Sequence, residues 1–178
     1  MRKVVVYELL SLDGVADDPD SFFDDWDDTM EANLADVIGM QDAVILGRRS
    51  YGEWAQFWPS SEIEPFATFI NGVTKYVVTS TPLDRGWANA TVIDRGLVEF
   101  VRDLKEQSGG DIGVHASISV AQALLAADLV DEIKLVIAPK IAAHGRRLFD
   151  GHPSIQLDTI RSGASPSGYL LVDYRIRR

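Results

Sequence analysis

Three short polar turns each follow an apolar run, and their residue types are suited to binding phosphate. They are Gly47-Arg48-Arg49-Ser50, Thr79-Ser80-Thr81 and His115-Ala116-Ser117-Ile118-Ser119. Two of them lead straight into predicted helices, whose exposed backbone N–H groups attract phosphate. Hydroxyl and guanidinium groups are also suitable phosphate partners. A ligand that carries several phosphates, such as a dinucleotide, could contact all three turns.

Each turn also has a purely structural explanation. Gly47 would only permit a tight turn, and Ser50, Ser117 and Ser119 would only cap helices. The two arginines that follow Gly47 would be solvated surface charges. One turn alone favours this explanation, whereas the three together, in a strand–helix context, favour a site.

An aromatic group follows the first turn, and it has two interpretations. Tyr51, Trp54, Phe57 and Trp58 either pack in the core of a short helix or form a wall on which a flat heterocycle stacks. His115, at the end of an apolar run, either lines a site or is a hydrogen-bonded structural histidine.

Several other kinds of site are excluded. The chain has no cysteine, and it contains no G-x-x-x-x-G-K-[ST], G-x-G-x-x-G or G-x-S-x-G motif. The histidines lack zinc-site spacing, so we expect no metal. An acidic stretch is either a solvated loop and helix start or a divalent-cation site, although its spacing differs from that of an EF-hand. Its members are Asp13, Asp17, Asp18, Asp20, Asp24, Asp25, Asp27 and Asp28.

Charge and length limit the partners. The formal net charge of -10 disfavours nucleic acid and anionic membrane surfaces, which bind clustered Lys and Arg. The first residues are too short an apolar run for a signal peptide, and no run is long enough to span a membrane. We therefore expect a cytoplasmic protein with one domain over residues 1–178.

The turns must be positioned by alternating strands and helices. Apolar runs predict strands at residues 4–10, 43–46, 76–79, 91–93, 112–115 and 132–138, then two more at 155–160 and 169–176 joined by a turn-rich segment, 162–168. Helical spacing predicts helices at 27–38, 48–54, about 63–70, 98–104 and from about 120. This order implies an α/β fold, with a mainly parallel sheet, helices on both faces and an antiparallel C-terminal edge.

At this point the motifs match a known family. Residues 42–51, DAVILGRRSY, resemble the strand–Gly-Arg–helix segment of dihydrofolate reductases. They are still more similar to the reductase domain of the bifunctional riboflavin-biosynthesis deaminase-reductases and their stand-alone relatives. Residues 75–82, 124–133 and 145–149, with Ser11-Leu12-Asp13-Gly14, fit the same pattern. The resemblance covers nearly the whole chain.

The resemblance implies a three-layer α/β/α fold of the dihydrofolate reductase type, NADPH as the hydride donor, a small heterocyclic substrate (pterin-, flavin-precursor- or aminopyrimidine-like) and often a homodimer. Carried over by position, three sets of residues would bind the cofactor. Gly47, Arg48, Arg49 and Ser50 would approach its phosphates, Ser80 and Thr81 its adenosine side, and Ala116, Ser117, Ile118 and Ser119 its pyrophosphate.

The acceptor would lie among Ser11, Asp13, the first helix and the wall from Trp54 to Trp58, with Asp13 or Glu31 orienting it or supporting its protonation. One departure from the family stands out. Ala116-Ser117 replaces the usual glycine pair, and each Cβ takes up room near the pyrophosphate. Two hypotheses therefore remain: an NADPH-dependent reductase, or a non-catalytic protein of the same fold that binds a nucleotide or heterocycle.

Overall fold

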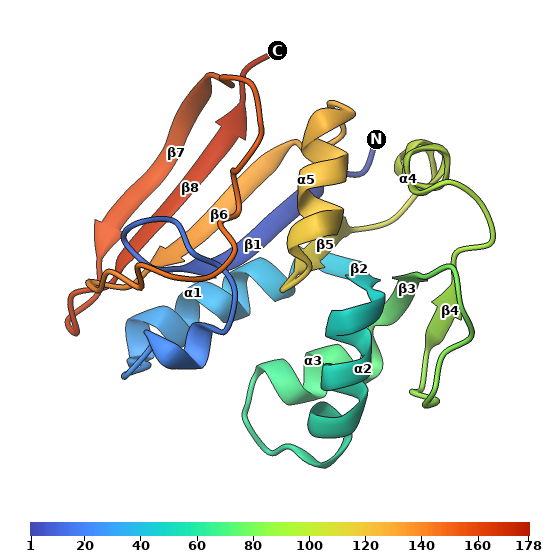
Figure 1. Cartoon of the computed structure of the whole chain (residues 1–178), viewed down its shortest axis with the longest axis horizontal. Coiled ribbons are helices and arrows are strands. Elements are labelled where there is room, and N and C mark those ends of the chain that lie inside the picture. The colour runs from blue at the N-terminus through green and yellow to red at the C-terminus, as the bar shows by residue number, and fades with distance from the viewer.

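Apolar runs rich in valine and isoleucine become the strands of one sheet in the computed structural model, which describes residues 1–178 (Figure 1). The strands are β1 (Val4–Leu10), β2 (Gln41–Gly47), β3 (Thr74–Val78), β4 (Ala90–Val92), β5 (Asp111–His115), β6 (Glu132–Ile137), β7 (Leu157–Ala164) and β8 (Leu170–Ile176). The helices are α1 (Asp28–Ile38), α2 (Arg48–Phe57), α3 (Phe66–Gly72), α4 (Leu97–Glu106) and α5 (Ile118–Ala126).

The sheet has the strand order β4-β3-β2-β5-β1-β6-β8-β7. All pairs from β4 to β6 are parallel, whereas β8 pairs antiparallel with both β6 and β7. The predicted α/β fold with an antiparallel C-terminal edge is therefore confirmed. Because β3, β2 and β5 are neighbours and run in the same direction, their carboxyl ends meet at one edge of the sheet.

Two apolar clusters, one on each face of the sheet, pack the helices onto it and give three layers. Val101 of α4 and Leu124 of α5 pack with Val6 on one face of the sheet. Met30 of α1 and Ile70 of α3 pack with Val44 on the other face, where α2 also lies. None of the helices is long and apolar enough to cross a membrane.

The C-terminal edge differs in detail from the prediction. The strand expected at 155–160 is β7, which runs on to Ala164 with an irregularity between Thr159 and Arg161. The turn therefore begins later than residue 162. Because β7 pairs on one side only and is exposed along most of its length, no apolar pattern marks its end.

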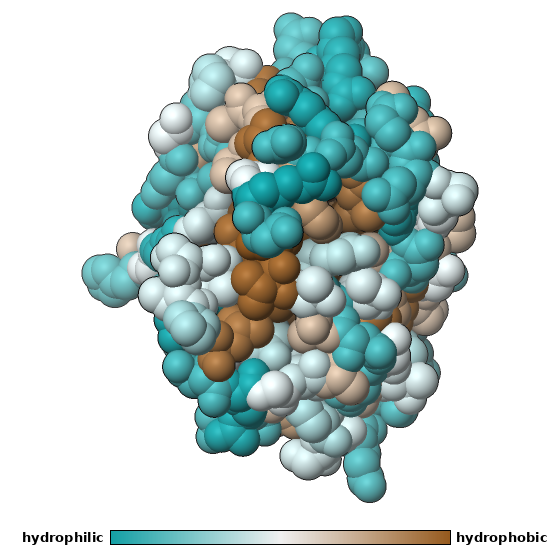
Figure 2. Space-filling model, turned by 90° about the vertical axis from the view of Figure 1, so that its right-hand side faces the viewer, coloured by the Kyte–Doolittle hydropathy of each residue, from teal (hydrophilic) through white to brown (hydrophobic).

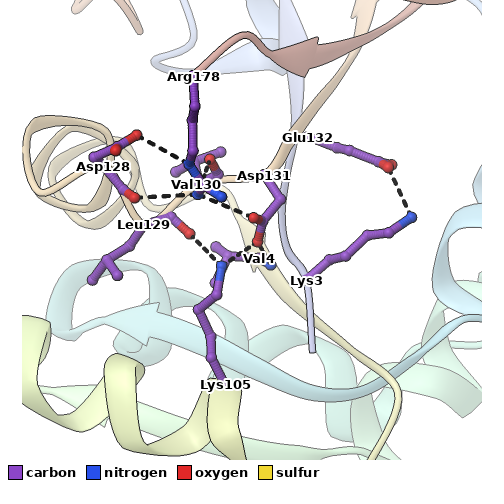
Figure 3. A network of polar contacts seen from close by, with 9 residues as sticks. All are labelled: Lys3, Val4, Lys105, Asp128, Leu129, Val130, Asp131, Glu132 and Arg178. Carbon is purple, nitrogen blue, oxygen red and sulfur yellow. Dashed lines mark hydrogen bonds and ion pairs between the residues drawn. The ribbon is translucent and has the colours of Figure 1, made fainter. Parts of the chain in front are cut away.

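Polar contacts join the two ends of the chain near the amino ends of the central strands β1 and β6, away from the three turns (Figure 3). Asp131 accepts hydrogen bonds from the backbone N–H of Val4, from the buried Lys105 ammonium and from Arg178. Lys105 also donates to the carbonyl oxygen of Leu129 at 3.1 Å. One carboxylate thus links the start of β1, α4, the segment before β6 and the C-terminal residue.

Candidate functional site

The structure brings the three polar turns together. They follow β2, β3 and β5, and direct hydrogen bonds connect the first turn to each of the others. The backbone N–H of Gly47 donates to Ser117 Oγ at 3.0 Å, and Ser50 Oγ donates to the carbonyl oxygen of Ala116 at 2.6 Å. The Arg48 guanidinium donates to the Thr81 hydroxyl. The turns therefore form one continuous polar rim.

The serines of this rim do not cap helices, so the capping role considered for Ser50, Ser117 and Ser119 is wrong. Ser117 precedes α5, but its hydroxyl makes no cap hydrogen bond and contacts Gly47 instead. Ser50 bonds across to the Ala116 carbonyl, and Ser119 accepts from Arg146 at 2.9 Å. The first-turn N–H groups of α2 and α5 thus lack side-chain caps.

Gly47 is not required by a tight turn. Its φ of -74° suits any residue, and a Cβ there would make only ordinary contacts with Val120 and Ser117, at 3.6 and 3.9 Å. Neither backbone conformation nor packing demands glycine at this position. The missing side chain leaves the amino end of α2 open to a ligand.

Arg48 and Arg49 flank the amino end of α2, and each is paired with a carboxylate. Arg48 contacts Asp84 at 2.8 Å, while Arg49 contacts Glu53 at 3.1 Å and Asp17 at 3.5 Å. These ion pairs are exposed, and exposed pairs contribute little to stability. An incoming phosphate could therefore replace the carboxylates at small cost.

The second turn, Thr79-Ser80-Thr81, borders an open depression of about 450 Å³ lined by Thr79, Ser80, Thr81, Pro82 and residues 92–95. Figure 2 views the molecule from the side on which β4 lies and shows an apolar strip among hydrophilic residues. Val92 of β4 is 41% exposed and lines the depression. An apolar surface beside hydroxyls and an arginine, Arg95, suits the nucleoside part of a nucleotide.

Ala116 occupies the position where glycine was expected. Its φ of +48° lies in the left-handed region, which glycine adopts without strain and alanine at a cost of about 1 kcal/mol. The turn nevertheless keeps this conformation, and the Ala116 carbonyl oxygen accepts a hydrogen bond from Ser50 Oγ. Two uncapped helix ends, hydroxyls and arginines form a donor set that fits a diphosphate, so the residues present are compatible with a dinucleotide.

The turn after β1 is locked to the loop after β6. Asp13 accepts hydrogen bonds from Ser11 Oγ at 2.7 Å and from the backbone N–H groups of Ala142 and Ala143, both at 3.0 Å. The Ser11 hydrogen bond, followed by those of the two amides, lowers the pKa of Asp13 to about 2. Asp13 therefore stays ionised at neutral pH and orients this loop, while Ser11 is buried within the turn.

The aromatic residues that follow the first turn pack against one another and against Phe66. Trp54 and Trp58 are half-buried and meet Phe66 edge-on, with ring centroids 5.4 and 4.8 Å apart, whereas Tyr51 is buried in the core. Phe66 lies 5.6 Å from the His115 ring. The aromatic side chains thus run from α2 to the carboxyl end of β5.

His115 is a hydrogen-bonded structural histidine. Its Nε2 lies 2.8 Å from Gln41 Oε1, and burial lowers its pKa to about 3, so the ring is neutral. The bond passes over Gly113, where a Cβ would lie 2.2 Å from Gln41 Oε1. Glycine is required there because any side chain would break this contact.

Comparison with known proteins identifies the family of this chain. Residues 2–171 match the family model for the RibD C-terminal domain. The chain belongs to the RibD C-terminal domain family. Two relatives come from Bacillus subtilis (strain 168), the uncharacterized proteins YyaP and YwjB. YyaP is 25% identical and YwjB 28% identical, with coverage of 97% and 83% of this chain and 94% and 83% of the relatives.

Solved structures share the fold of this RibD C-terminal domain. A putative riboflavin biosynthesis protein from Shewanella sp. PV-4 superposes with a TM-score of 0.81 at 17% identity, covering 99% of both chains. A pyrimidine reductase-like protein from Corynebacterium diphtheriae gives 0.67 at 16% identity, covering 99% of this chain and 92% of the other. The Thermotoga maritima deaminase/5-amino-6-(5-phosphoribosylamino)uracil reductase gives 0.71 at 16% identity, and the match spans 99% of this chain but only 57% of that enzyme.

Glu31, the candidate acid carried over from dihydrofolate reductases, is exposed on α1. The buried side of α1 carries Met30, Asn33 and Leu34, and Glu31 lies exposed beside them. The polar group that α1 turns inward is therefore the Asn33 amide. No group of three or more histidine or acidic side chains is arranged so that it could hold a metal ion.

Sequence analysis missed a set of unpaired hydrogen-bond donors on this face of the RibD C-terminal domain. Their buried atoms have no partner: Tyr7 Oη, Asn33 Nδ2, Gln41 Nε2 and Trp58 Nε1. The Tyr7 ring lies 5.6 Å from His115, which connects it to Gln41 and, through Phe66, to Trp58. A polar residue within an apolar strand or helix stripe was the signal available for Tyr7 and Asn33.

Proposed function

We propose that this protein is a reductase that uses NADPH to reduce a small heterocyclic substrate. The observation that supports this most strongly is the joined, uncapped amino ends of α2 and α5, flanked by Arg48 and Arg49. Such paired helix ends with cations suit the diphosphate of a dinucleotide. Family membership and the names of the solved neighbours agree with a reductase.

Each turn has a role in the proposal. The amides after Gly47 and after Ala116 would hold the diphosphate, together with Ser50, Ser117, Ile118 and Ser119. Arg48 and Arg49 would exchange their carboxylate partners for phosphate, and Ser80 and Thr81 would contact the adenosine side. Bound NADPH would supply the hydride.

The acceptor would lie on the face of the sheet that carries the unpaired donors. Tyr7, Asn33, Gln41 and Trp58 offer N–H and O–H groups without acceptors, and a heterocycle with carbonyl oxygens and ring nitrogens would satisfy them. The rings of Trp54 and Trp58 would cover its flat surface.

Asp13 would act as a positioning residue. Because it stays ionised, it would hold the loop after β6 over the acceptor rather than supply a proton. Tyr7 is a neutral phenol, since burial raises its pKa, and it would donate a hydrogen bond to the acceptor. Glu31, exposed on α1, is the weaker candidate for the acid.

Fluorescence titration tests the proposal directly. We expect saturable binding of NADPH, tighter than that of NADH, and a loss of roughly tenfold to a hundredfold in affinity for Arg48→Ala plus Arg49→Ala, since charge-assisted hydrogen bonds are removed. Arg102→Ala, which changes an exposed arginine of α4, is the matched control and should bind normally.

Turnover separates the two hypotheses. NADPH oxidation should appear with one member of a panel of pterins, flavins and aminopyrimidines, and the double arginine variant should lose it. Binding without turnover across the panel would favour the non-catalytic alternative. Absence of saturable NADPH binding would contradict the proposed reductase function.

A further inference from the structure

Arg146 is an exposed arginine whose guanidinium forms no ion pair. It lies in the loop after β6, and its Nη2 atom donates to Ser119 Oγ, in the first turn of α5, at 2.9 Å. The other arginines near the amino ends of α2 and α5, namely Arg48, Arg49 and Arg147, are each paired with a carboxylate. The remaining N–H groups of Arg146 are therefore available to an anion, and no role in the three turns accounts for them.

The backbone that carries Arg146 is held in place by the segment after β1. The Arg146 carbonyl oxygen accepts a hydrogen bond from the Ala16 N–H at 2.9 Å, and Val15 and Arg147 form an isolated antiparallel bridge. Gly145 has a φ of +114°, and a Cβ there would lie 2.6 Å from Val15 Cγ1. Glycine thus lets the two segments approach closely, and their contacts fix the position from which the Arg146 side chain extends.

The same segment after β1 connects Arg146 to α2. Asp17, which follows the residues paired with the Arg146 loop, contacts the Arg49 guanidinium at 3.5 Å. On the other side of the two helices, the Gly47 N–H donates to Ser117 Oγ at 3.0 Å. A closed ring of contacts therefore joins the amino ends of α2 and α5, both of which lack side-chain caps, and Arg146 is part of this ring.

The strand order places the two helix ends at different parts of a dinucleotide. Helix α2 follows β2, whose neighbour β3 leads to the depression that suits a nucleoside. Helix α5 follows β5, whose other neighbour is β1, and the loop with Arg146 comes from β6, beyond β1. A dinucleotide with its adenosine in the depression would therefore present its adenosine-side phosphate to α2. Its other phosphate would meet α5 and Arg146.

We propose that Arg146 is a cofactor-binding residue for the phosphate on the nicotinamide side of the diphosphate, which it holds together with the first-turn amides of α5. Arg48 and Arg49 hold the other phosphate at the amino end of α2. Each phosphate then has one helix end and at least one guanidinium. The inference rests on the proposed function, because it takes NADPH as the ligand, and it adds a binding residue from outside the three turns.

A structural role alone makes a different prediction. If the hydrogen bond between Arg146 and Ser119 only ties the loop to α5, loss of the guanidinium would affect all ligands equally or not at all. A phosphate carried by the acceptor is a second source of the same chemistry. In that case Arg146 would still bind a phosphate while NADPH occupies the site.

The test is calorimetric titration of the full chain with NADPH and with adenosine 2′,5′-bisphosphate, the part of NADPH that ends at the adenosine-side phosphate. We expect Arg146→Gln to weaken NADPH binding by about tenfold, the effect of losing one charge-assisted hydrogen bond, and to leave binding of the bisphosphate unchanged. Arg146→Lys keeps the charge without the planar fork and should be intermediate. Arg175→Ala, which changes an exposed arginine of β8 without an ion pair, should bind both ligands as wild type does.

Phosphorus NMR of bound NADPH gives a second measurement that does not depend on the bisphosphate. We expect Arg146→Gln to shift the resonance of the nicotinamide-side phosphate and to leave that of the adenosine-side phosphate in place. A shift of the adenosine-side resonance alone, or of both equally, would overturn the proposal.

The remaining outcomes separate this proposal from the reductase. Equal loss of affinity for both ligands, or unchanged NADPH binding by Arg146→Gln, would overturn the role of Arg146 and leave the reductase intact. Ribose 5-phosphate that binds to the NADPH complex only when Arg146 is present would also overturn it, because the phosphate would belong to the acceptor. Selective loss of NADPH affinity in a protein that oxidises no NADPH would support Arg146 and count against the reductase. Failure of wild type to bind NADPH would overturn both.

Discussion

The residues of the polar rim formed by the three turns make their hydrogen bonds to neighbours on other elements. Ser50, Ser117 and Arg48 were identified from residue type and position, yet their partners are carbonyl, amide and hydroxyl groups of other turns. Residue type could predict that these groups bond, but not to what. A serine before a helix ordinarily caps it. The Ser117 hydroxyl instead accepts a hydrogen bond from Gly47, which is distant in sequence.

Asp13 allows a prediction at this scale. Asp13→Asn leaves at least one of the loop amides at Ala142 and Ala143 without an acceptor, because an amide nitrogen cannot accept. We expect hydrogen exchange at these two positions to become roughly tenfold faster, as measured residue by residue by NMR. Asp20→Asn, which changes an exposed aspartate without a hydrogen-bond partner for its side chain, should leave the exchange unchanged.

The effect of pH on this contact has a definite sign. The pKa of Asp13 is lowered to about 2, so its contribution to stability is complete above the ordinary aspartate pKa of about 4 and is lost as the pH falls through about 2. In wild type the protection of Ala142 and Ala143 should therefore disappear only in strong acid. Loss of protection already near pH 5 would show that another group controls the loop.

The elements were predictable where one face of each is buried. The helix periodicity located α1 and α4 within a residue or two, because an apolar stripe has to face the sheet. The edge strand β7 lacks that constraint and was placed less well. The buried Lys75 was not interpretable from sequence, because its ammonium group donates to the carbonyl oxygens of Ile70 and Val73.

Asp131 tests how the elements are held together. Asp131→Asn would leave the Lys105 ammonium, which is 6% exposed, without its charged partner. We expect the free energy of unfolding in urea to fall by about 3 kcal/mol, the order typical of breaking a buried ion pair. Asp128→Asn is the control, because the Asp128 side chain is 71% exposed and its only ion pair is with Arg178; it should change stability by no more than about 0.5 kcal/mol. Equal effects of the two changes would contradict the role given to Asp131.

At the scale of the molecule, the strand order determines which turns lie side by side in the candidate site. Alternating strands and helices predicted a largely parallel sheet, and in such sheets ligands bind beyond the carboxyl ends of the strands. The sequence could therefore predict that the three turns share an edge. It could not predict that β3, β2 and β5 are neighbours, nor that the unpaired donors of β1, β2, α1 and the turn after α2 lie on one face, because both follow from the strand order. A homodimer stays a prediction from the family resemblance.

The measurement that tests the account most directly is a crystal structure of the protein soaked with NADPH. We predict that the diphosphate lies between the first turns of α2 and α5, with the nicotinamide directed towards Tyr7 and His115. A dinucleotide bound at another edge of the sheet, or phosphates that contact neither Gly47 nor Ser117, would contradict the proposal that the three turns form one binding site.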